Sequence, residues 1–545
     1  MKIPIVIGVT GHRDLRQQDI PQIREMVHTE LQKLKTEYSH SELKMLNSLA
    51  CGADTICAEE ALALDISLIC PLPMDQEEYS KDFSEEERID YNNLISKAED
   101  VFVAPSTEPR KEGRDYLYRQ AGIYVASHCQ VLLALWDGAE GKPDGCGTAE
   151  TVGFMLQEKY DDGNRHFRAA NDGAVIHILT LRRDSKDDRP VTSKLIEEEA
   201  GSLKEILSRT DEFNKDAESL PDDSSESYSL LSAESVPKNS WLKRLNILYN
   251  VADRLSMKCQ RQYLKAIKCF SIFGFLLVLF FLLYDELELN LFLLGYGLLI
   301  LIYLAAFVFV KKKNFHDKYL QYRLLSETMR VQFYLTALGL KENVGNEFTW
   351  TQKRESTWIK EAVSALCIGN PQQQPVSEEQ IKIDWIDGQL DYHKKAFQRD
   401  DHKHKINERA TKWLLIASVA LFVIVFAMEL FLKSSLEYEL VKMSFLNLAI
   451  QNQEYGLTVL ALMKILLGGV SAITVFLANY YGKLSFERKT IDHAKMSDLY
   501  ESAKWQYEYG QMDRKQLFRE LAREEIIENG NWMSYCKENP PSFNL

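Results

Sequence analysis

Short apolar runs alternate with amphipathic segments through residues 1–183. Apolar runs bounded by turn signals predict strands, and these lie at 3–9, 43–50, 67–74, 101–104, 130–136 and 174–181. The segments between them place apolar residues on one helical face, as in the first, which carries Ile20, Ile23, Val27, Leu31 and Leu34. Strands that alternate with helices predict an α/β fold with a doubly wound parallel sheet, a Rossmann-like domain.

Four long apolar segments dominate the second half of the chain, near 267–284, 289–310, 413–432 and 457–481. A helix needs about 20 apolar residues to cross a bilayer, so each segment predicts a transmembrane helix. The acidic cluster Asp285, Glu286 and Glu288 separates the first two, which predicts a hairpin, and the last two predict a second hairpin. A soluble, mostly buried helical core is the alternative explanation.

Basic residues flank both predicted hairpins at their ends. No Lys or Arg occurs in the first turn, whereas the flanks carry Arg254, Lys258, Arg261, Lys265, Lys268, Lys311, Lys312 and Lys313. The second hairpin repeats the bias with Lys403, Lys405, Arg409, Lys412, Lys483, Arg488 and Lys489. Because positively charged loops stay in the cytosol, both termini are expected there.

The chain after residue 240 contains an internal repeat, with units at 241–370 and 384–545 and a linker at 371–383. The stretch "LSETMRVQFYL" from Leu325 matches "LYESAKWQYEYG" from Leu499. Each unit is expected to contain a basic cytosolic helix, a membrane hairpin and a return helix, whose aromatic residues pack against other helices: Phe333, Tyr334, Trp505 and Tyr507. Residues 184–240 are rich in serine and acidic residues, which predicts a partly disordered linker or, alternatively, a binding tail, apart from a possible helix around 194–208.

Charge and cysteine content narrow the possible partners. The 545 residues carry a net charge of −14, which argues against nucleic acid as a partner. The nine cysteines form no C-x-x-C pair, so neither a disulfide framework nor a metal site is expected. Two ionisable residues, Glu429 and Lys464, fall within predicted membrane segments at similar depth. They either pair there as pore residues or extend to the interface.

Three loops rich in small residues follow predicted strands. The first holds Gly8, Thr10, Gly11, His12 and Arg13, the second Gly52, Ala53 and Asp54, and the third Asp137, Gly138, Gly145, Gly147, Thr148 and Glu150. The carboxyl ends of parallel strands meet at one edge of a sheet, and backbone N–H groups at helix starts there bind phosphate. A tight turn or a helix cap explains any one loop equally well, but three at one edge predict a ligand site.

These loops resemble the SLOG superfamily, which is related to the LOG nucleotide phosphoribohydrolases and to the sensing region of melastatin-type channels. The resemblance rests on "GVTGHRDL", "SLACGAD", "VLLALWDG" and "GCGTAE" and covers most of residues 1–160. It implies an ADP-ribose-like or cyclic nucleotide ligand and no required cofactor. Thr148 and Glu150 are one residue closer than in the LOG motif, and Arg119 only roughly takes the place of the LOG arginine. Nucleotide binding is therefore expected rather than hydrolysis.

The membrane half resembles the SLATT family of two-helix membrane effectors, through "KYLQYRLLSETMRVQFY", "WIDGQLDYHKKA" and "SDLYESAKWQY". Together the two resemblances imply a nucleotide-gated effector of a bacterial antiphage or conflict system. It would act as a homo-oligomeric pore in the inner membrane. One alternative is a membrane-anchored hydrolase that cleaves N-glycosidic bonds of nucleotide or NAD derivatives with Glu150 and Arg119. Another is a signalling scaffold without a pore.

Overall fold

The computed structural model describes residues 2–108, 113–141, 145–157, 173–197, 199–221, 228–232, 240–369, 375–432, 439–442, 456–484 and 486–538. The chain forms two compact units. The first, the sheet unit, comprises Met1–Leu255, Gln321–Ile381 and Asp513–Met533. The second, the membrane unit, comprises Ser256–Leu320, Lys382–Met512 and Ser534–Leu545.

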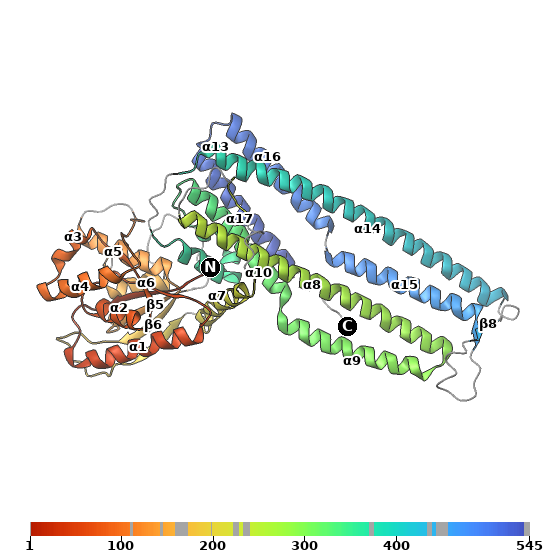
Figure 1. Ribbon diagram of the computed structural model, residues 1–545, viewed down its shortest axis with the longest axis horizontal. Helices are drawn as coiled ribbons and strands as arrows, with labels where there is room; N and C mark the ends of the chain where they lie inside the picture. The colour runs from red at the N-terminus through yellow and green to blue at the C-terminus, as the bar shows by residue number, and fades with distance from the viewer. Residues whose placement is uncertain are drawn as a thin grey trace. The chain divides into compact units, whose positions relative to one another are not determined.

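A seven-stranded sheet forms the core of the sheet unit (Figure 1), in the order β4-β3-β2-β1-β5-β6-β7. Its strands are β1 (Ile5–Gly11), β2 (Leu43–Leu46), β3 (Ser67–Leu72), β4 (Asp100–Val103), β5 (Val131–Trp136), β6 (Ala174–Leu179) and β7 (Ser193–Glu197). The first six are parallel and β7 is antiparallel to β6. This arrangement confirms the predicted α/β fold.

The alternation of residues along β1 divides the hydrophobic core into two layers. Ile5 and Ile7 face a layer built from α1 (Ile20–Glu37), α2 (Ala53–Ala63) and α4 (Glu85–Lys97). Val6 faces the opposite layer, which contains α5 (Arg114–His128) and α6 (Thr148–Gln157). Short helical turns complete this part of the chain: η1 (Gln17–Asp19), α3 (Gln76–Tyr79) and η2 (Ser80–Asp82). Both faces of the sheet are therefore covered, as parallel sheets require.

Part of the segment expected to be a linker is folded. Residues 193–197 form β7, and α7 (Ser202–Glu218) packs Leu203 and Leu207 into the first core layer. Its Asn214 side chain also donates to the carbonyl oxygen of Ile3 at 2.9 Å and accepts from the N–H of Ile3. A possible helix was expected around 194–208, but residues 193–197 form a strand and the helix begins at Ser202, with its few apolar residues on one face.

Helices from the second half of the chain complete the sheet unit. They are α10 (Phe315–Ala337), η4 (Val344–Glu347), α11 (Trp350–Glu355), α12 (Thr357–Leu366), α13 (Glu378–Ile381) and α17 (Arg514–Glu538). Ala365 and Ile368, at the end of α12 and just after it, join the second core layer of the sheet. The side chain of Gln130, before β5, donates to the carbonyl oxygen of Glu361 at 3.1 Å. The sheet and these helices therefore share one core.

The membrane unit contains α8 (Ser240–Leu287) beyond Leu255, and α9 (Asn290–Lys313). Its other elements are η5 (Lys382–Asp387), α14 (Gly388–Ala427), η6 (Met428–Leu432), β8 (Glu439–Lys442), β9 (Gly456–Thr458), α15 (Val459–Leu484) and α16 (Phe486–Tyr509). Four helices are long and apolar enough to cross a membrane, with candidate spans in Trp241–Leu287, Asn290–Ala337, Glu378–Leu430 and Ala461–Ala478. Few residues of these spans are buried. Four long apolar helices thus confirm the predicted segments.

Glycines allow close contact between α8 and α15. A Cβ atom added at Gly274 would lie 2.5 Å from the Phe476 ring, and one added at Gly468 would lie 2.5 Å from Leu282. Small residues at helix crossings let helix backbones approach closely, which stabilises helix pairs in lipid. Phe270 and Tyr303 form an edge-to-face contact between α8 and α9, at 5.0 Å between ring centroids. The spans therefore associate through specific packing.

The two return helices of the repeat lie in different environments. On α10, Leu325, Phe333 and Tyr334 are all buried in the sheet unit. On α16, Tyr507 is buried, but Trp505 is 59% exposed. Trp505 therefore does not pack closely against another helix of the same chain, whereas Tyr507 does.

Candidate functional site

The predicted loops lie at the carboxyl edge of the sheet, where β1 and β5 are neighbours. Strand β2 pairs with one side of β1, and β5, which comes later in the chain, pairs with the other side. The strand order therefore reverses between β1 and β5. Open α/β sheets bind ligands at such a switch point. The geometry of the edge therefore identifies the side chains available to a ligand.

The first two loops pack directly against each other. The backbone N–H of Ala53 donates to the carbonyl oxygen of His12 at 3.1 Å. A Cβ atom at Gly11 would collide with Ala53, and one at Gly52 would collide with the backbone of Arg13. Gly52 also has a φ of +81°, which favours glycine. These two glycines therefore allow the first and second loops to pack closely against each other.

Gly8 and Thr10 lie within β1. Gly8 is buried beneath α5, where an added Cβ atom would lie 2.6 Å from Sγ of Cys129. Thr10 is half-buried and pairs with Ala134 of β5. In this structure Gly8 thus contributes strand–helix packing rather than an open surface.

His12 connects the ends of β1 and β5. Its Nε2 atom lies 3.2 Å from the backbone nitrogen of Asp137 and 3.2 Å from Oδ1 of the same residue. Burial and the charge of Arg182 lower the pKa of His12, against the opposing effect of Asp137. Nε2 of His12 therefore lies within hydrogen-bond distance of both the backbone N–H and the carboxylate of Asp137.

Asp137 is surrounded by arginines that the sequence reasoning missed. Arg182, after β6, lies 3.5 Å from its carboxylate, and Arg189 donates to its carbonyl oxygen at 3.0 Å. Burial alone would raise the pKa of Asp137, but the N–H of Ala139, His12 and Arg182 together hold it below its ordinary value. Both arginine side chains are about half exposed. Only the fold brings them to this edge, since no short motif contains them.

Arg13 extends from the first loop and is exposed. Its guanidinium lies 5.2 Å from the ring centroid of Tyr118 on α5. Its charge lowers the pKa of Cys51 and Cys146, but burial outweighs it and raises both, that of Cys51 to about 11. Both thiols are thus protonated at neutral pH and are poor nucleophiles. The charge of Arg13 acts on residues of all three loops, including Asp54.

Asp54 is buried at the start of α2. Its Oδ2 accepts the backbone N–H of Ala50 at 3.2 Å. Burial raises its pKa to about 7, although the Ala50 N–H and Arg13 act in the other direction. The carboxyl group thus stabilises the second loop from within.

The third loop closes on its own helix. The backbone N–H of Gly147 donates to Oε2 of Glu150 at 3.0 Å, and a Cβ atom at Gly145 would collide with Glu150. Arg119 donates two hydrogen bonds of 2.8 Å to Glu108 and a third, of 3.3 Å, to the carbonyl oxygen of Gly145. Glu150 and Arg119 are therefore engaged within the protein. Thr148 begins α6.

Two further features of the loops bear on a ligand. Gly138 has a φ of +83°, and no atom lies within 4 Å of a Cβ atom added there. Asp144, the first residue of "DGCGTAE", lies outside the described residues. No group of three or more His, Cys, Asp and Glu side chains suited to a metal occurs in the part of the chain that the structure describes.

In the membrane unit, Lys464 Nζ lies 2.8 Å from Oε1 of Glu429. Their pairing was one of two predicted possibilities, and the structure contains it. Glu286, at the end of α8, lies 3.9 Å from the same ammonium group, a contact that sequence reasoning missed. No family model matches the chain, and no curated protein matches it.

Proposed function

We propose that the chain is a nucleotide-signal-gated membrane effector, which acts as a homo-oligomer in a bacterial inner membrane within an antiphage or conflict system. One observation carries the proposal. Helix α8 begins at Ser240 in the sheet unit and continues without a break to Leu287, so the first candidate span is a direct extension of the unit that holds the ligand loops. A helix shared by both units offers a route by which a ligand that favours one state can affect a membrane span. The resemblances to SLOG and SLATT supply the nucleotide, the bacterial membrane and the biological setting.

The charges at the carboxyl edge suit an anionic ligand. Arg13 is exposed, and Arg182 and Arg189 are half exposed, although Arg182 pairs with Asp14 and Asp137 and Arg189 with Asp187. Guanidinium groups bind phosphate with two parallel hydrogen bonds, and the ring of Tyr118 next to Arg13 offers a stacking surface. The open backbone at Gly138 leaves room beside them. An ADP-ribose-like or cyclic nucleotide combines a phosphate for the arginines with a base that can stack on the Tyr118 ring.

Four spans enclose little space, so a conducting path requires several chains. The spans expose many large apolar side chains that are suited to lipid or to other copies, among them Leu294, Leu298, Val308, Phe422 and Val475. The basic flanks support a topology with both termini in the cytosol, which places the ligand loops on the side where nucleotide signals arise.

The hydrolase alternative receives no support from the described contacts. Glu150 accepts the N–H of Gly147, and Arg119 is paired with Glu108, so neither side chain is directed to a substrate. A sensor requires neither of them to be free.

The test uses the full chain in liposomes with a trapped dye, exposed in turn to ADP-ribose and to cyclic AMP. We expect one of them to release the dye, and Arg13→Ala and Arg182→Ala to require about tenfold more of it, the cost of a lost charge-assisted hydrogen bond. Lys33→Ala, an exposed change on α1, is the control and should behave as the wild type.

Two outcomes would overturn the proposal. If the nucleotide is cleaved repeatedly and the dye stays inside, the chain is a membrane-anchored hydrolase. If neither probe binds or releases dye, the nucleotide assignment fails. Light scattering in detergent that shows only a monomer, with and without probe, would contradict the pore.

A further inference from the structure

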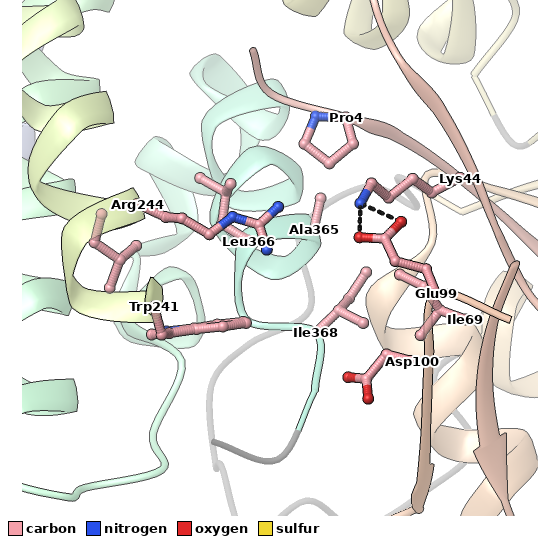
Figure 2. A pocket seen from close by; sticks show the side chains of 11 residues that line it. Pro4, Lys44, Ile69, Glu99, Asp100, Trp241, Arg244, Ala365, Leu366 and Ile368 are labelled. Carbon is pink, nitrogen blue, oxygen red and sulfur yellow. Dashed lines mark hydrogen bonds and ion pairs between the residues drawn. The ribbon is translucent and has the colours of Figure 1, made fainter. Parts of the chain in front are cut away.

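A cavity of about 240 Å³ lies at the edge of the sheet opposite the ligand loops. It is lined by residues near the amino ends of strands, including Pro4 before β1, Lys44 in β2 and Asp100 at the start of β4. The start of α8 and the end of α12 form its other side (Figure 2). All of its lining residues belong to the sheet unit. The cavity is therefore separate from the carboxyl edge.

About half of the cavity wall is apolar, and this part is formed by Pro4, Ile69, Leu245, Ala365, Leu366 and Ile368, with the indole of Trp241 at one end. Pockets for drug-sized ligands span about 300–1,000 Å³, so this cavity suits a smaller molecule. ADP-ribose, with its adenosine, diphosphate and second ribose, is too large for it.

Four charged side chains line the cavity, and two of them neutralise each other. Lys44 Nζ lies 2.5 and 2.7 Å from the two carboxylate oxygens of Glu99. Lys44 is buried, so this pair is a fixed part of the wall. The dashed lines in Figure 2 mark it.

The other two charges, Arg244 and Asp100, have no hydrogen bond or ion pair with any described residue, and Figure 2 shows both at the cavity. Arg244 follows Trp241 by three positions on α8, so the guanidinium and the indole lie on the same face of that helix. Asp100 approaches from the sheet. Both residues are exposed, so one solvent-accessible cation and one solvent-accessible anion border a small space whose wall is about half apolar.

We propose that this cavity binds a free α-amino acid with a small apolar side chain. Arg244 forms an ion pair with the carboxylate of the amino acid, and Asp100 forms one with its ammonium group. The side chain of the amino acid packs against the apolar wall beside Trp241. A zwitterion matches the two open charges, which a simple anion or cation would satisfy only in part. Because Trp241 and Arg244 lie on α8, the bound molecule also links the sheet to the helix that becomes the first candidate span. An effect of the amino acid on the membrane span through α8 rests on the proposed function, whereas binding of the amino acid in the cavity does not.

The test is calorimetric titration of the full chain in detergent with L-leucine and L-valine. Leucinamide lacks the carboxylate and 4-methylpentanoate lacks the ammonium group, so each should bind about tenfold or more weakly than L-leucine. Arg244→Gln should weaken L-leucine to the level of leucinamide and leave leucinamide unchanged. Asp100→Asn should weaken L-leucine binding to the level of 4-methylpentanoate and leave the binding of 4-methylpentanoate unchanged.

Two exposed neighbours supply matched controls: Lys243→Gln on α8 and Asp90→Asn on α4, each of which should bind L-leucine as the wild type does. The melting temperature of each variant verifies folding. The proposal is overturned if neither amino acid binds, if Arg244→Gln leaves the preference for L-leucine over leucinamide intact, or if inorganic phosphate or AMP competes for the site. Dye release in liposomes is scored separately, so failure of amino-acid binding and failure of the effector function are distinguished.

Discussion

Arg330 on α10 and Glu525 on α17 form a buried ion pair across 195 residues of sequence, with Nη2 of the arginine 3.1 Å from Oε2 of the glutamate. The second Nη of Arg330 lies 2.5 Å from Glu327, which also pairs with Arg323. Arg323 in turn contacts Asp253 on α8 at 3.2 Å. Burial acts to raise the pKa of Glu327, but the two arginines hold it below its ordinary value. This network joins three helices of the sheet unit.

Removing one partner of the network should destabilise the sheet unit strongly. Glu525→Ala removes the buried carboxylate that α17 supplies to Arg330, which keeps Glu327, so we expect a loss of about 3 kcal/mol, the lower end for a broken buried pair. The exposed pair of Arg519 and Glu342, which also joins α17 to this unit at 2.6 Å, is the matched control. Arg519→Ala should cost less than about 1 kcal/mol. Chemical denaturation in detergent measures both, and equal losses would show that the buried network has no special weight.

The stability of the sheet unit should depend on pH through Asp54. Its folded pKa of about 7 lies above the ordinary value of 3.8, so the folded chain retains a proton that the unfolded chain releases. The stabilisation is complete below pH 3.8 and is lost as pH rises to about 7, a total on the order of 4 kcal/mol. Asp54→Asn should remove this decline, and the exposed Asp90→Asn should retain it. Melting temperatures across this pH range provide the measurement, and parallel curves for all three proteins would refute the assignment.

Substitution of glycines at the carboxyl edge should separate packing from backbone strain. Gly52→Ala places a methyl group against the backbone of Arg13 at a positive φ, with an expected loss of about 3 kcal/mol. Gly138→Ala meets a similar φ but open space, so it should lose only about 1–2 kcal/mol. Denaturant midpoints compare the two variants. Similar losses would mean that the contact between the first two loops is loose.

The pair of Lys464 and Glu429 should stabilise the membrane unit. Lys464→Gln leaves Glu429 and Glu286 without their shared cation, whereas the double variant Lys464→Gln with Glu429→Gln restores a neutral contact. We expect a coupling energy of about 1 kcal/mol, typical of polar contacts within membranes. A double-mutant cycle on melting temperature in lipid nanodiscs measures it, and additive single effects would indicate that both side chains extend separately to the interface.

For the candidate site, the sequence predicts where the loops lie but not which residues they contact. The loops at Gly11, Gly52 and Gly147 were correctly assigned to strand ends, because small residues after apolar runs are a local signal. The roles of these glycines were not accessible, since Gly11 and Gly52 contact residues of the other loop. Arg182 and Arg189 carry no motif and reach the edge only because β6 lies beside β5.

The α/β class and the four apolar helices can be predicted from the amino-acid sequence, because both follow from periodicity and composition within continuous segments. Which helices join which unit depends on the folded arrangement of the chain. Helices α10 and α17 have ordinary amphipathic patterns, yet the ion pair between Arg330 and Glu525 and the packing of α12 on the sheet place them with the Rossmann-like fold. Such choices depend on contacts between residues far apart in the chain, which no local pattern encodes. The cavity of Arg244 and Asp100 arises for the same reason, as its walls come from strands and helices more than two hundred residues apart.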